Sequence, residues 1–122
     1  MAEFDSATMS SLGGSQEVDI RAPGAESAVP IWTVRVGNEI FVRSYRGEAG
    51  RWYQAVKSAA RASIGYEGGE IEVAVEPVGD EALNEAVNAQ YLAKYRTSSA
   101  VQAMVSPEVE ATTLRLEPTA AG

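Results

Sequence analysis

The sequence predicts one α+β domain, mostly β, whose antiparallel strands form a barrel-like wall with helices packed outside it. Three observations favour this fold class. Short alternating β-rich runs are joined by tight turns, and two longer segments repeat apolar residues with helical spacing. The central hairpin is apolar on both faces, which suits a barrel wall better than an open sheet with one wet face. With 122 residues, 45% of them hydrophobic, the chain can form one core.

The first 16 residues are expected to form a flexible tail or a loosely docked turn of helix. They are rich in Ser, Gly and Ala, and their sizeable apolar residues are Phe4, Met9 and Leu12. The barrel domain is therefore predicted to span residues 17–118, followed by a short C-terminal tail over residues 119–122.

The first strand is predicted over residues 17–22, where Val18 and Ile20 alternate with charged residues. Pro23-Gly24 ends it, and a loop follows to Val29.

The firmest prediction is a hairpin of residues 31–36 and 39–45, joined by Gly37-Asn38. Two residues of this kind form the tight primed turns of hairpins. The turn sets a register in which three pairs lie opposite each other: Val36 and Glu39, Val34 and Phe41, Trp32 and Arg43.

A helix is predicted over residues 51–62 from its helix-forming composition and three-to-four-residue apolar spacing. Residues 62–66 and 71–77 then form a second hairpin around Glu67-Gly68-Gly69. The glutamates of this hairpin are expected on a solvated face: Glu70, Glu72 and Glu76.

Asp80 is predicted to cap a second helix that ends near Arg96, because apolar residues repeat every four positions after it. Residues 100–105 fit no single pattern. The alternation over residues 108–117 predicts a last strand.

The chain has no histidine and no cysteine, which excludes catalytic triads, thiolate chemistry and most zinc or haem sites. No metal site is expected. The net charge of −7 opposes binding to nucleic acid or to an anionic membrane surface. Because no signal-peptide or membrane-spanning segment is evident, a cytoplasmic protein is expected.

Positive charge is concentrated in residues 35–61, which contain six basic residues and two acidic ones. This window is +4, so the remainder of the chain sums to −11. It combines a loop containing Gly47 and Gly50 with a helix N-terminus at Arg51-Trp52, and free N–H groups at such a site attract phosphate or carboxylate. The alternative is a set of surface arginines that pair with glutamates around an ordinary turn.

Two tryptophans flank this basic window. Trp32 is expected beside Arg43, and either Trp32 or Trp52 could stack on a planar ligand, although tryptophans are more often core residues. The candidate ligand-binding residues are Trp32, Arg43, Ser44, Arg46, Gly47, Gly50, Arg51, Trp52 and Lys57.

Over residues 30–55, from Pro-Ile-Trp-Thr-Val to Arg-Trp-Tyr-Gln-Ala, the chain resembles the bacterial domain-of-unknown-function family 2255. The likeness extends from about residue 17 to residue 118. That family is similar to the flavin-binding split-barrel proteins and to their deazaflavin-dependent nitroreductase-like group. The resemblance implies a split β-barrel of about six antiparallel strands with two outer helices, commonly a homodimer, with the cofactor in a groove at the barrel edge.

In the deazaflavin group, a Pro-Leu strand, a Ser-x-x-Gly loop and a Trp-Tyr helix start line the cofactor site. Here Pro30-Ile31, residues 44–47 and Trp52-Tyr53 match them. Ala55 stands in place of the group's helix asparagine. The segment 23–27, which contains Glu26, stands in place of its basic phosphate-holding loop.

Two functions are therefore expected from different classes. The first is an oxidoreductase that binds FMN or a deazaflavin, with the hydride chemistry supplied by the cofactor. The second is a non-enzymatic homodimeric module that binds a small anionic ligand, or that pairs its basic window with the acidic faces of its twin.

Overall fold

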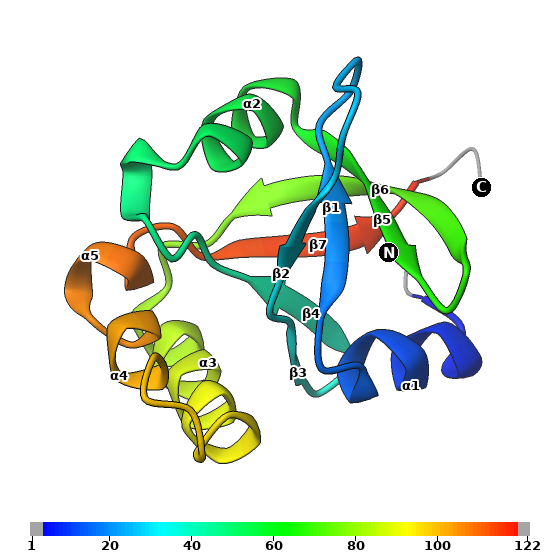
Figure 1. The fold of residues 1–122 in the computed structure, drawn as a ribbon. Helices are drawn as coiled ribbons and strands as arrows, with labels where there is room; N and C mark the ends of the chain where they lie inside the picture. The colour runs from blue at the N-terminus through cyan, green and yellow to red at the C-terminus, as the bar shows by residue number, and fades with distance from the viewer. Residues whose placement is uncertain (1–3, 120–122) are drawn as a thin grey trace.

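A computed structural model describes residues 4–119 of the chain (Figure 1). In chain order its elements are α1 (Ser6–Gly14), β1 (Val18–Arg21), β2 (Val29–Ile31), β3 (Val34–Val36), β4 (Glu39–Val42), the 3-10 turn η1 (Gly47–Ala49), α2 (Arg51–Ala59), β5 (Arg61–Tyr66), β6 (Gly69–Pro77), α3 (Glu81–Lys94), α4 (Val101–Met104), α5 (Pro107–Glu110) and β7 (Leu114–Pro118).

Across residues 4–119, seven antiparallel strands form one sheet in the order β2-β1-β5-β6-β7-β4-β3. β2 and β3 stand at opposite ends of this order, yet only Trp32 and Thr33 separate them in sequence. Two intervening residues span roughly 10 Å at full extension, so the two ends of the sheet must lie close together. The sheet is therefore curled into a half-barrel (Figure 1). This confirms the predicted α+β, mostly β fold class.

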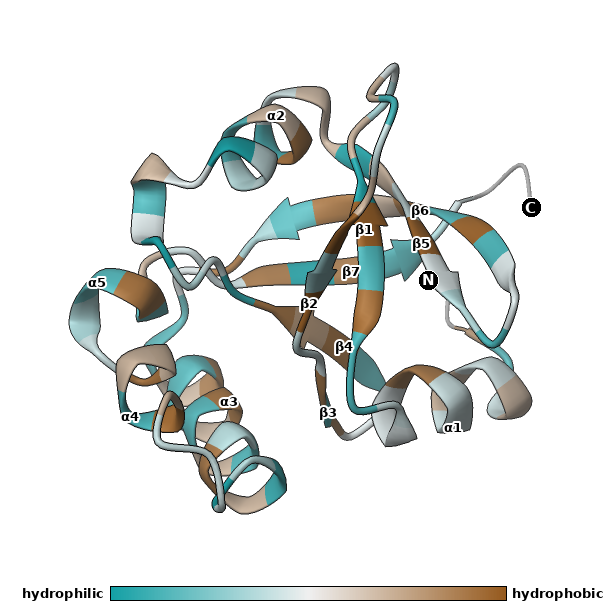
Figure 2. Cartoon of the chain, in the orientation of Figure 1, coloured by the Kyte–Doolittle hydropathy of each residue, from teal (hydrophilic) through white to brown (hydrophobic). Residues whose placement is uncertain are grey.

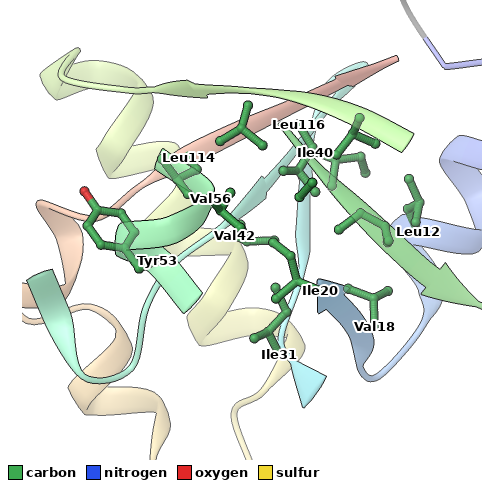
Figure 3. Close-up of a cluster of buried hydrophobic side chains, with 14 of the residues drawn as sticks. Leu12, Val18, Ile20, Ile31, Ile40, Val42, Tyr53, Val56, Leu114 and Leu116 are labelled. Carbon is green, nitrogen blue, oxygen red and sulfur yellow. The ribbon is translucent and has the colours of Figure 1, made fainter. Parts of the chain in front are cut away.

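The larger core fills the inside of this curl. Alternation along β4 directs Ile40 and Val42 inward, where α1 and α2 also contribute apolar side chains. Figure 3 shows the strand residues Ile20 and Leu116 in the same cluster as Val56 of α2. Inward-facing positions alternate with polar ones along the strands, visible as brown and teal bands in Figure 2.

A second core lies on the outer side of the β3–β4 hairpin. Val34 and Phe41 pack there against Val87 and Tyr91 of α3, and all four are buried. The predicted apolar character of both faces of this hairpin is therefore explained, because one face lines the half-barrel and α3 with α4 covers the other.

Within residues 4–16 the structure has the helix α1 in place of a flexible tail, so the docked helix is the closer of the two expectations for this segment. Asp5 caps α1 by accepting a 2.8 Å hydrogen bond from the Thr8 amide. Met9 and Leu12 lie one turn apart and insert into the larger core, with 3% and 0% of their surfaces exposed. Residues 1–3, and residues 120–122 of the expected C-terminal tail, lie outside the described residues.

The hairpin around Gly37-Asn38 is confirmed, with Val34 opposite Phe41 and Val36 opposite Glu39. The expected pairing of Trp32 with Arg43 is wrong. The preceding residues leave the hairpin and form β2, which pairs with β1 through Val18 and Ile31. β2 is therefore a separate strand, in addition to the six strands that were expected.

The second hairpin, β5–β6, and the helices α2 and α3 are also confirmed, with Asp80 capping α3 through a 2.8 Å bond from the Leu83 amide. α2 ends earlier than expected because Ala60 adopts a left-handed conformation. Residues 100–105 contain α4. The last strand begins only at Leu114, since Pro107 starts the short helix α5.

Across residues 4–119, no helix combines the length and the apolar character needed to cross a membrane.

Candidate functional site

A cavity of about 430 Å³ lies where β2, the end of β4, the start of α2 and α4 meet. Segments that are distant in sequence supply its walls. The lining residues are Glu17, Val29, Pro30, Ile31, Trp32, Arg43, Ser44, Tyr45, Arg46, Gly50, Arg51, Trp52, Ala100 and Met104.

The first turn of α2 forms one end of the cavity. Gly50 is its N-cap and has no side chain to receive the free amides, so the first N–H groups of the helix lack a cap. The helix dipole adds positive potential at the same point. Gly47 prepares this geometry: its φ of +68° closes a turn in which its amide donates to the Ser44 carbonyl at 2.9 Å.

Ser44 places a hydroxyl at this end of the cavity. Its side chain is fully buried, and among the described residues its Oγ has no hydrogen-bond partner. A Cβ added at Gly50 would overlap this Oγ, so glycine leaves the space that the hydroxyl occupies at the helix start. A buried hydroxyl without a partner is unfavourable, and a ligand acceptor could satisfy it.

Two exposed arginines of the lining stand near the same helix start. Arg46 precedes η1 and Arg51 is the first residue of α2. Within residues 4–119, no carboxylate lies within salt-bridge distance of either guanidinium. Their positive charges are therefore available to an anion in the cavity.

Arg43 is a lining residue of another kind, because its side chain is 1% exposed and its guanidinium donates to protein acceptors. The acceptors are Thr113 Oγ1 at 2.8 Å, the Met104 carbonyl at 2.9 Å, and Asn84 and Asn88 of α3. Burial lowers the pKa of Arg43, while Tyr91 and Glu110 act in the opposite direction. Arg43 therefore fixes the wall between β4 and α3 and leaves no N–H group free for a ligand.

Trp32, from the link between β2 and β3, forms another part of the cavity wall. Its indole stacks on the Tyr95 ring, with centroids 4.0 Å apart and planes 2° apart. The Tyr95 hydroxyl accepts a bond from the Thr33 amide and lies 2.8 Å from the Gln16 carbonyl. Burial is the main cause that raises the pKa of Tyr95 to about 12.

Lys94 adjoins this stack at the end of α3. Its Nζ donates to the Thr33 carbonyl and lies 5.1 Å from the Tyr95 ring centroid. Burial lowers the pKa of Lys94 to about 8.

Residues 8–116 match the family described as "Uncharacterized protein conserved in bacteria (DUF2255)". The chain belongs to the DUF2255 family. No curated protein matches it. The region shared with the family contains nearly all of the described fold and every residue that lines the cavity of this DUF2255 protein.

The cavity brings together most of the residues predicted for a binding site. Seven of the nine lie in its lining: Trp32, Arg43, Ser44, Arg46, Gly50, Arg51 and Trp52. Gly47 stands outside the lining and shapes the turn behind it. Lys57 lies further along α2, where its Nζ is 5.6 Å from the Tyr53 ring centroid.

Several lining residues of the DUF2255 protein were missed by sequence reasoning: Glu17, Val29, Tyr45, Ala100 and Met104. Tyr45 lies within the loop of residues 44–47 that the resemblance pointed to, although it was not named as a binding residue. Ala100 and Met104 come from the segment without a clear pattern, and Glu17 comes from the edge of the first strand, so no local signal connects them to the loop.

Proposed function

We propose that this DUF2255 protein binds a small planar ligand with an anionic group, and that FMN or a deazaflavin is the class of ligand it takes. The observation that carries the proposal is a convergence at one end of a cavity. Among residues 4–119, a buried hydroxyl without a partner, a helix start without a side-chain cap and two arginines without a salt bridge meet there. Each of these features favours a phosphate or carboxylate.

The size and lining of the cavity suit such a ligand. Pockets for small molecules and cofactors usually enclose about 300–1,000 Å³, and this cavity measures about 430 Å³. The indoles of Trp32 and Trp52 supply flat apolar surface. Ser44, Arg51 and the first amides of α2 would hold the anionic group, and Trp32 or Trp52 would contact the ring system.

A flavin or deazaflavin would supply hydride transfer, which the side chains of a protein without histidine and cysteine do not provide. The chain itself would bind and orient the cofactor. The apolar walls from Ile31 and Met104 would limit the access of water to the ring. The curled sheet and the sequence resemblance to flavin-binding split barrels support an oxidoreductase of this kind.

Fluorescence titration with FMN and with riboflavin tests the proposal, because the two differ by the phosphate. We expect FMN to bind at micromolar concentration and riboflavin to bind more weakly. The R46A/R51A variant should reduce FMN affinity by about tenfold or more, since charge-assisted hydrogen bonds contribute about 1.5–3 kcal/mol each. The matched control is R61A, which removes an exposed arginine of β5 outside the cavity.

Deazaflavin is titrated in parallel, and the absorption spectrum of the protein as isolated shows any retained cofactor. If neither FMN nor deazaflavin changes the fluorescence, the flavin assignment is wrong. If R46A/R51A binds FMN as the wild type does, the anion site is wrong.

The second candidate is a non-enzymatic homodimer that binds a small anionic ligand. It is favoured by two exposed apolar residues at the cavity rim, Val29 at 39% and Tyr45 at 60%. Sedimentation across salt concentrations separates two modes of pairing. A dimer formed through this apolar rim should persist at high salt and weaken in V29D, whereas a dimer formed through the basic residues should dissociate as salt rises.

A further inference from the structure

Glu17 is the one acidic residue of the cavity lining, whose other members are basic, aromatic, aliphatic or small uncharged residues. It is exposed, and within residues 4–119 no ion pair engages its carboxylate. An ionised carboxylate has only acceptor oxygens, so it attracts a hydrogen-bond donor or a cation and repels an anion.

The register of the first two strands places Glu17 at the Trp32 end of the cavity. Val18 pairs with Ile31, so continuing the antiparallel ladder by one residue brings Glu17 opposite Trp32. The electrostatics of Tyr95 agree with this position. Its pKa is raised first by burial and also by the negative charge of Glu17, and its ring is the one that stacks on Trp32.

The basic residues of the lining that have no salt-bridge partner within residues 4–119 come from a different part of the chain. Lys94, which adjoins the Trp32–Tyr95 stack, lies outside the lining and donates to the Thr33 carbonyl. Arg46 directly precedes the η1 turn and Arg51 is the first residue of α2, while the unpartnered Ser44 hydroxyl lies in the loop that follows β4. These basic residues of the lining therefore lie at the start of α2, and its acidic residue lies where β1 begins and β2 ends, with an indole in the lining at each place.

We propose that the cavity selects a bipolar ligand, with an anionic group at the α2 end and a hydrogen-bond donor or cationic group at the Glu17 end. Glu17 acts as the specificity-determining residue, because it rejects ligands that carry a second anionic group at that end. This inference rests on the proposed anion site and adds the chemistry of the opposite end.

Three naphthalene probes test it by titration calorimetry. One is a monosulfonate, the second also carries an amino group on the far ring, and the third carries a second sulfonate at that far position. The wild type is expected to bind the amino monosulfonate most tightly and the disulfonate most weakly. Each step should change the affinity by about threefold or more, the size expected for a partly solvated charge.

E17Q removes the charge and keeps the size of the side chain. It should strengthen disulfonate binding by about threefold or more, and weaken the preference for the amino probe. E72Q is the matched control, because it makes the same charge change on an exposed residue of β6 outside the cavity. E72Q should leave the order and spacing of the three affinities unchanged.

The outcomes separate this inference from the proposed function. If the plain monosulfonate fails to bind, or binds R46A/R51A as well as the wild type, the anion site itself is wrong. If the monosulfonate binds through the arginines but the three probes bind equally, or E17Q behaves like E72Q, the anion site stands and the role of Glu17 is overturned.

Discussion

The Tyr95 hydroxyl accepts a 3.1 Å hydrogen bond from the Thr33 amide and so joins the end of α3 to the two-residue link between β2 and β3. The same hydroxyl lies 2.8 Å from the Gln16 carbonyl. Tyr95 also stacks on Trp32. Its side chain therefore stabilises both the link between the two ends of the sheet and the part of the cavity wall that Trp32 forms.

Tyr95→Phe should lower the free energy of unfolding by about 1–3 kcal/mol, because a buried amide and carbonyl lose their partner while the ring remains. Urea unfolding measures the change. Tyr45→Phe is the control, since that ring is 60% exposed, and it should stay close to the wild type. Equal stability of Y95F and the wild type would show that the hydroxyl does not hold this junction.

Lys94 should make stability depend on pH. Its pKa is about 8 in the folded protein against an ordinary value of 10.5, so between these values the unfolded chain holds a proton that the folded protein has lost. The unfolding free energy therefore rises with pH through this window and gains nothing from Lys94 below it. Urea unfolding of the wild type and K94M, at the lower and upper ends of the window, should show the wild type gaining relative to the variant. A constant difference would contradict the shift.

Arg43→Lys should lower the unfolding free energy by about 3 kcal/mol or more, because a buried ammonium cannot reach the acceptors on α3, α4 and the segment before β7. Arg35→Lys is the control: Arg35 is exposed and donates to the nearby Gly37 carbonyl at 2.8 Å. It should change stability by less than about 0.5 kcal/mol. If R43K is as stable as R35K, the buried network does not support the wall.

Gly50→Ala should destabilise the fold because its Cβ would overlap Ser44 Oγ. In the S44A/G50A double variant the nearest remaining contact is the Gly47 carbonyl at 3.4 Å, so much of the loss should be recovered. A double-mutant cycle by thermal or urea unfolding should give a coupling of about 1–3 kcal/mol. Gly79→Ala is the control, since nothing lies within 4 Å of its added Cβ. Additive effects at positions 44 and 50 would contradict this contact.

Leu12→Ala should cost about 2–5 kcal/mol, the range for a buried leucine whose site cannot fully collapse. Leu12 is fully buried in the larger core, whereas Ser10 on the same helix is exposed. Ser10→Ala should therefore be close to neutral. If L12A changes the free energy of unfolding only slightly in urea, α1 is a loosely attached segment.

Elements with a strong local signal were predictable from the sequence. Gly37-Asn38 fixed the β3–β4 register, and Asp80 marked the start of α3. The sequence left α1 undecided between a tail and a docked turn of helix, because its two buried residues, Met9 and Leu12, are surrounded by small residues that give little apolar periodicity. The Asp5 cap was the signal that could have revealed this helix.

The residues of the candidate site also divide into those with a local sequence signal and those without one. Most of the predicted site residues fall within the short segment 44–52. Its glycines, arginines and helix start could therefore be recognised together from the sequence. Glu17 and Met104 reach the cavity through tertiary packing, and the position of Trp32 depends on its segment leaving one strand pair for another. Such strand pairings depend on residues that are far apart in the sequence, and a local pattern carries no information about them.

The place of β7 in the sheet has a consequence for the order of assembly. It is the last strand of residues 4–119, yet it lies between β6 and β4, and its Leu116 pairs with both Val75 and Ile40. Until β7 arrives, β6 and β4 each present an open edge that could pair with another chain. The two parts of the sheet therefore unite only when β7 pairs with both of them, and such distant pairing favours slow folding.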